Sequence, residues 1–160
     1  MLFIVYNMNI ILILITIIYN SYIILKYKKI PVSLSETSYM LGGLKRYWFT
    51  AYCIATVFLA LPCLLNIVPE CLTFLPFLMC GGMLFAGVSP LFKEGLDKPV
   101  HYISSIFSFI VFLIFTVLIM GWVYLLIYLI LLGLLVLWKK ECYVYFAEIL
   151  IYIFIIIFIL

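Results

Sequence analysis

The side chains of this sequence that could bind or react with a polar molecule gather in two short polar segments. The first segment, residues 31–46, places Ser33, Ser35 and Glu36 ahead of the basic residue Arg46. Serine hydroxyls accept amide hydrogen bonds where a helix begins, and an acidic side chain is favoured at that positive end. We therefore expect a capped helical turn that lies along the surface. The alternative is a short lid or a ligand-binding loop.

The second polar segment, residues 92–101, contains Lys93, Asp97 and His101. Asp97 is expected to cap a helix that begins there, which places His101 one turn inside it. Ser104 and Ser105 continue the polar stripe at helical spacing. As the single histidine of the chain, His101 could accept a proton or contact a ligand. We favour a hydrogen-bonded histidine that holds the two polar segments together.

Glu148 is the ionisable residue that lies clearly inside a long apolar segment, about 10 Å along a helix from Glu141. Burial of an isolated carboxylate is costly, so this group must be neutralised, paired or reached by water. Acidic residues in such positions are functional candidates. The alternative is that Glu148 reaches back toward Lys139, Lys140 or the membrane interface, and the sequence leaves both interpretations open.

No motif for catalysis, a cofactor or a metal is present. The five cysteines include no Cys-x-x-Cys pair, and there is no second histidine to complete a zinc site. We expect most of these cysteines to be small buried residues. Cys63 and Cys71 flank a short loop, so a disulfide between them is a further hypothesis.

Composition and length determine the class of protein. The chain has 160 residues, of which 70% are hydrophobic and 9% are charged, and a water-soluble domain could not cover that much apolar surface. A membrane-spanning helix needs about 20 apolar residues. The sequence predicts a single all-α transmembrane domain, residues 1–160, whose six spans cover about 2–25, 47–68, 72–92, 100–120, 122–138 and 142–160.

The basic residues predict an orientation. All nine lysines and arginines fall in the loops after the first, third and fifth spans, and the opposite loops have none. By the positive-inside rule these loops face the cytoplasm and both termini lie outside. We expect a multi-pass protein of a cell membrane, most simply a bacterial inner membrane. The scattered basic residues fit membrane lipids as partners and exclude a nucleic-acid partner.

Small residues predict which spans pack at the centre. Helices in lipid approach closely where glycine, alanine or serine recurs four residues apart. Because such pairs occur in the second, third and fourth spans, we expect these three at the centre and the bulkier first, fifth and sixth spans toward lipid. The pairs are Ala51 and Ala55, Gly82 and Ala86, and Ser104 and Ser108.

Three stretches carry a resemblance to known sequences. They are PVSLSETSY at 31–39, LPFLMCGGMLFAGVSP at 75–90 and KPVHY at 98–102. Over about residues 31–121 the chain resembles small uncharacterised membrane proteins of Bacteroides-type bacteria and their phages or mobile elements. More distantly it is similar to the six-span DRAM/Frag-like superfamily. The resemblance implies six spans and singles out the two polar segments, and it implies no reaction.

Three functions are compatible with this pattern. We favour a non-enzymatic membrane protein whose two polar segments bind a lipid headgroup, a small ligand or a membrane partner, with a homo-oligomer as one form of partner. The second is a small transporter or channel that uses Glu148, although no internal repeat is present to support alternating access. The third is a lipid hydrolase or transferase built on His101 with Ser104 or Ser105, which lacks a clear third catalytic partner.

Overall fold

The chain folds into α-helices joined by short connections. The computed structural model describes residues 2–92 and 95–159, with side chains described from residue 7 onward, and this part of the chain contains no strand. Several connections contain a turn of 3-10 helix, as at Gly43–Arg46 and Glu70–Leu72. The α-helices are α1 (Leu2–Tyr27), α2 (Glu36–Leu41), α3 (Tyr47–Ile67), α4 (Phe74–Val88), α5 (Asp97–Phe115), α6 (Trp122–Trp138) and α7 (Tyr143–Ile159).

Five helical segments are long and apolar enough to cross a membrane. Each has at least 20 residues, so its rise of about 1.5 Å per residue spans the hydrocarbon layer of about 30 Å. The chain is therefore a multi-pass helical membrane protein. These segments are Asn7–Tyr27, Gly43–Ile67, Glu70–Leu91, Asp97–Met120 and Lys140–Ile159.

The predicted break between the spans at 100–120 and 122–138 is confirmed at Gly121. A wide helical turn, Thr116–Met120, ends α5, and the Gly121 N–H donates to the Thr116 carbonyl at 2.8 Å. The φ of Gly121 is 97°, which glycine adopts without the steric cost of a Cβ. The chain then reverses into α6, whose 17 residues extend for about 25 Å.

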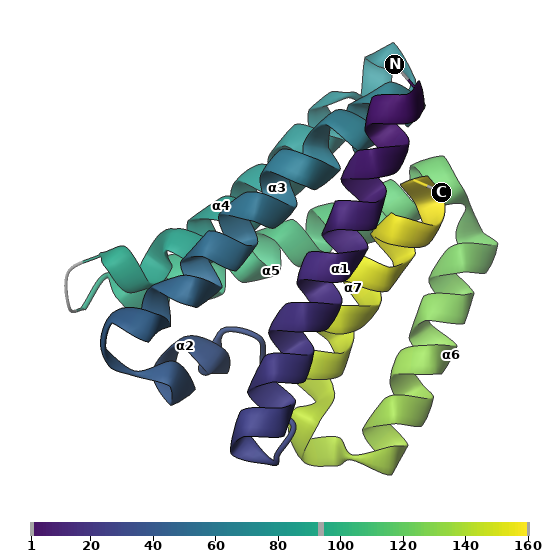
Figure 1. The fold of residues 1–160 in the computed structure, drawn as a ribbon. Coiled ribbons are helices and arrows are strands. Elements are labelled where there is room, and N and C mark those ends of the chain that lie inside the picture. Colours follow the sequence, from purple (N-terminus) through teal and green to yellow (C-terminus); the bar gives the residue numbers. More distant parts are fainter. Residues whose placement is uncertain (1, 93–94, 160) are drawn as a thin grey trace.

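The helices form one bundle in which the start of α1 and the end of α7 lie at the same end (Figure 1). At that end, the Asn9 side-chain amide donates to the Ile159 carbonyl at 3.4 Å. The segment between α1 and α3, which contains α2, lies at the opposite end together with the connection from α6 to α7 (Figure 1). The first polar segment therefore lies at one end of the bundle.

The close approach of α3, α4 and α5 is confirmed at two glycines of α4. A Cβ on Gly82 would lie 2.9 Å from the Ser108 Cβ of α5, and a Cβ on Gly87 would lie 2.3 Å from the Cys53 Cβ of α3. Real Cβ atoms do not approach this closely. Glycine therefore sets the distance between α4 and each neighbour.

The predicted position of the bulky spans is wrong for α7 and correct for α6. Helix α7 contributes seven buried residues, including Leu150 and Phe154, whereas Tyr128 is the one buried residue of α6. Helix α1 also turns one side, with Leu12 and Ile23, toward the core. Conversely the buried residues of α5, among them Phe112 and Phe115, all lie near its end, and the rest of the helix is exposed or half-buried.

Candidate functional site

The first polar segment turns one side into the bundle and leaves residues 42–46 exposed. Leu34 is 3% exposed, and Thr37 of α2 is completely buried. The expected helical turn is present as α2, with Thr37, Ser38 and Leu41 buried and Tyr39 exposed, and its position along the membrane surface stays a prediction. The segment packs in this way because its apolar side chains join the buried cluster formed by Tyr19, Tyr52 and Phe146.

Local hydrogen bonds shape this turn. The Ser33 hydroxyl accepts the Glu36 N–H at 3.1 Å, as the sequence predicted, and it contacts the Ser35 hydroxyl at 3.0 Å. Ser35 precedes α2 but makes no side-chain cap bond. The Glu36 carboxylate accepts the Val32 N–H and forms an ion pair with Lys29 at 3.8 Å. These polar groups are therefore occupied with one another.

Glu148 connects this segment to α7. Its carboxylate accepts the Leu34 N–H at 2.7 Å, across 114 residues of sequence, and it forms no ion pair with any described residue. Glu148 therefore forms no ion pair with Lys139 or Lys140, and its carboxylate reaches back to the first polar segment instead. In the opposite direction, the Tyr145 N–H in the first turn of α7 donates to the Val32 carbonyl at 2.9 Å. The segment thus caps α7 while α7 holds the segment.

Tyrosine hydroxyls add to this connection. The Tyr19 hydroxyl shares a hydrogen bond with the Thr37 hydroxyl, and the Tyr145 hydroxyl donates to the Asn20 side-chain oxygen at 2.9 Å. Tyr52 of α3 stacks on Tyr19 with ring centroids 4.5 Å apart. Residues of α1, α3 and α7 therefore surround the folded segment with hydrogen-bonding groups and flat rings.

His101 connects α5 to the end of α4. Proline has no N–H, so Pro90 leaves the Ala86 carbonyl without its helical donor. The Ser89 hydroxyl donates to that carbonyl at 2.8 Å, and the His101 Nδ1 lies 3.2 Å from both the carbonyl and the Ser89 hydroxyl. Because a carbonyl only accepts, Nδ1 carries the hydrogen in this arrangement. His101 therefore joins two helices, and the expectation that it holds the two polar segments together is wrong.

The serines of the α5 stripe are used within the helix pair. Ser104 donates to the carbonyl of His101 or Val100 in its own helix, and Ser108 donates to the Met79 carbonyl of α4 at 2.8 Å. No hydrogen bond is found for the side chain of Ser105 among the described residues. The structure therefore shows no contact between His101 and the hydroxyl of Ser104 or Ser105, which the hydrolase hypothesis requires.

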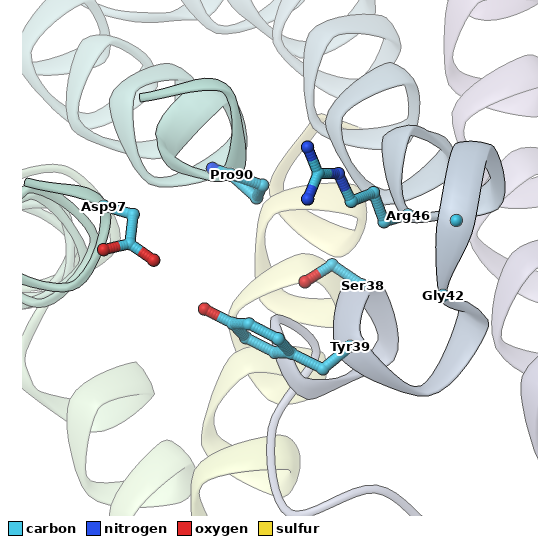
Figure 2. Close-up of a pocket in the computed structure, with 7 residues that line it drawn as sticks. Ser38, Tyr39, Gly42, Arg46, Pro90 and Asp97 are labelled. Carbon is cyan, nitrogen blue, oxygen red and sulfur yellow. The ribbon is translucent and has the colours of Figure 1, made fainter. Parts of the chain in front are cut away.

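A polar pocket of about 200 Å³ lies where the two polar segments meet. Figure 2 shows the Asp97 carboxylate on one side and the Arg46 guanidinium on the other, with the hydroxyls of Ser38 and Tyr39 directed into the space between them. Helix α2, the turn after it, the end of α4 and the start of α5 contribute the walls. The lining residues are Ser38, Tyr39, Gly42, Gly43, Arg46, Pro90 and Asp97.

The two charged groups of the pocket do not neutralise each other. Within residues 7–92 and 95–159 the one ion pair joins Lys29 to Glu36. Arg46 instead donates to the hydroxyl of its neighbour Tyr47 at 2.9 Å and lies 4.9 Å from the centre of that ring. Asp97 was expected to cap α5, but it is the first residue of the helix and makes no cap bond. Among the described residues its carboxylate has no ion-pair partner.

The structure brings together two of the predicted site residues, Arg46 and Asp97. Ser33, Ser35 and Glu36 belong to the local network of the turn, and Lys93 lies outside the described residues. Ser38 and Tyr39 of the pocket were in the stretch singled out by the resemblance, but they were not chosen as site residues. A hydroxyl three residues after Ser35 in a helical turn lies near the same face, which is the pattern that could have identified Ser38.

The cysteines form no metal or disulfide site in the described part of the chain. Cys71 has a free, exposed thiol, whereas Cys63 is buried, so the hypothesis of a disulfide between them is wrong. No group of three or more metal-binding side chains is found among the described residues.

Comparison with protein-family models, curated proteins and solved structures finds no match to this chain. The resemblance to six-span membrane proteins stays a prediction.

Proposed function

We propose that this chain is a six-span membrane protein that binds a phosphate-bearing lipid headgroup in the pocket between Arg46 and Asp97. In this proposal α6 forms the sixth span, because its 17 residues lie at the lower limit for crossing. The basic connections face the cytoplasm and both termini face the opposite side, as the positive-inside rule predicts. The bacterial inner membrane is the membrane we infer.

The observation that carries the proposal is that two opposite charges line the pocket without forming an ion pair among the described residues. An arginine and a carboxylate face one cavity at the end of the bundle, and neither is ion-paired with a described residue. Arginine presents several donors in a fixed plane and suits phosphate oxygens. The pocket lies between the ends of membrane-spanning segments, which is the depth at which lipid headgroups lie.

Orientation can be tested with thiols. Cys71 is the exposed cysteine, and the other four are buried. A membrane-impermeant maleimide added to intact cells should therefore label the natural chain, and Cys71→Ser should abolish labelling. In the Cys71→Ser background, Lys45→Cys should react only after the membrane is permeabilised. Labelling of Lys45→Cys in intact cells would contradict the proposed orientation.

Headgroup binding can be tested by comparing two neighbouring cations. Arg46 lines the pocket, whereas Lys45 is exposed and does not. Arg46→Gln should weaken phospholipid binding to the purified full chain about tenfold or more, because a charge-assisted hydrogen bond contributes about 1.5–3 kcal/mol. Lys45→Gln removes the same charge and should leave binding unchanged.

Native mass spectrometry with short-chain phospholipids measures both affinities in the same detergent. Equal loss of binding in the two variants would mean that general positive charge, and not the pocket, attracts the lipid. No loss in either variant would overturn the proposed function.

A further inference from the structure

We infer that the pocket selects phospholipids whose headgroup carries a primary amine together with the phosphate, the phosphoethanolamine class. This inference rests on the proposed function and specifies its ligand. It follows from the presence of one cation and one anion on opposite sides of the same cavity, each without an ion-pair partner among the described residues.

The charge arrangement matches a dipolar ligand. A phosphate placed against Arg46 would leave the other end of the headgroup facing Asp97 across the pocket. An ammonium there can donate to the Asp97 carboxylate, whereas a neutral group would leave that carboxylate unpaired in a partly enclosed space. The pocket therefore distinguishes the two ends of its ligand.

The hydroxyl of Ser38 strengthens the preference for an amine. Ser38 is a buried side chain, and its hydrogen is donated to the Ser35 carbonyl at 2.8 Å. Its oxygen can therefore only accept a hydrogen bond in the pocket. A primary ammonium has three hydrogens to donate, so it can use both Ser38 and Asp97.

The same groups disfavour a quaternary ammonium. A trimethylated amine has no hydrogen to donate, and proteins recognise it with cages of several aromatic rings. Tyr39 is the single aromatic residue among the lining residues. Phosphatidylcholine should therefore bind more weakly than phosphatidylethanolamine.

Anionic lipids without an amine should also bind weakly. Phosphatidylglycerol offers the phosphate to Arg46 but places neutral hydroxyls against Asp97, and its negative charge is not balanced. The cavity of about 200 Å³ corresponds to roughly seven water molecules at about 30 Å³ each. This volume accommodates a small headgroup of the phosphoethanolamine size.

The test uses the purified full chain and short-chain phosphatidylethanolamine, phosphatidylcholine and phosphatidylglycerol, with binding followed by native mass spectrometry. We expect phosphatidylethanolamine to bind about tenfold or more tightly than the other two lipids. Asp97→Asn should remove this preference and keep binding of phosphatidylglycerol. Arg46→Gln should weaken the binding of all three lipids. Glu141→Gln, at an exposed acid outside the pocket, is the matched control and should keep the preference.

Soluble phosphoethanolamine distinguishes the source of the ligand. If it competes as strongly as the lipid, the pocket binds the free compound by the same chemistry, and if it competes weakly, the lipid is the ligand. Equal binding of the three lipids in the natural chain, with loss of all three in Arg46→Gln, would overturn the amine preference but keep the proposed function. Lipid binding that does not depend on Arg46 would overturn both.

Discussion

Gly87→Ala is expected to lower the thermal stability of the purified protein sharply, whereas Gly81→Ala should leave it unchanged. The two glycines lie in the same helix, and both substitutions add one methyl group. A Cβ at Gly87 would lie 2.3 Å from the Cys53 Cβ and 2.9 Å from its Sγ, but a Cβ at Gly81 meets no atom within 4 Å. The difference therefore measures the contact between α3 and α4 and excludes a general effect of replacing glycine in a helix.

The expected cost of Gly87→Ala comes from overpacking. No rotation of the Cys53 side chain relieves a clash with its Cβ, so α3 and α4 must move apart. Such changes cost about 1–3 kcal/mol in packed cores. The movement would also stretch the bond that the Thr50 hydroxyl donates to the Gly87 carbonyl at 2.8 Å, which satisfies an otherwise unpaired carbonyl at the end of α4.

A double variant makes the test specific. Cys53→Gly removes the Cβ that the new methyl group would strike, so it should restore part of the stability lost in Gly87→Ala. Melting temperatures of the two single variants and the double variant, in one detergent, form a double-mutant cycle. Additive losses would show that the two residues do not contact each other as described.

Glu148→Leu is expected to destabilise the protein and open the folded segment between α1 and α3. The substitution removes the acceptor of the Leu34 N–H, which Glu148 holds at 2.7 Å. An intramolecular hydrogen bond contributes about 0.5–1.5 kcal/mol, and leaving the buried Leu34 N–H without an acceptor costs about 1–3 kcal/mol. Glu148→Gln keeps a side-chain carbonyl and should have a smaller effect. Glu141→Gln is the control at an exposed acid of the preceding connection.

Opening of the segment can be followed with a natural cysteine. Cys142 is 3% exposed, and its thiol is directed at the Ile30 carbonyl at 3.6 Å. In the Cys71→Ser background, Glu148→Leu should therefore increase the rate at which a maleimide labels Cys142. An unchanged rate together with an unchanged melting temperature would show that Glu148 does not hold the segment. The transport hypothesis for Glu148 stays a prediction, but its carboxylate now has a structural role that any such function must include.

Several features could be predicted from the sequence because they depend on neighbouring residues. Gly121 interrupts an apolar run that is too long for one crossing, and glycine accommodates the positive φ of the reversal. The serine-rich stretch predicted a helical turn, and α2 is present there. Long apolar runs predicted the spanning helices, since a backbone in lipid must satisfy its own hydrogen bonds.

The distribution of helices between core and lipid could not be predicted from side-chain size. Large apolar side chains pack equally well against lipid and against protein. The sequence of α7 therefore does not show whether this helix is buried or faces lipid. Its Phe154 and Leu150 are buried because α7 packs against α6 as well as against α1 and α3, and Phe154 meets the Tyr128 ring of α6, while α6, equally apolar, remains at the edge. The small residues did predict the contacts of α4, because glycine at those contacts is a steric requirement.

The sequence by itself determined the membrane-spanning class, the helices, the turn at Gly121 and the two polar segments, since each depends on local composition and spacing. Only the tertiary structure decided that Arg46 and Asp97 face one pocket and that Glu148 meets Leu34, 114 residues away. The physical reason is that these partners lie on different helices, and their distance depends on how the helices pack. The glycines predicted the close contacts of α4, but the other helices pack through large apolar side chains, whose partners local sequence patterns do not specify.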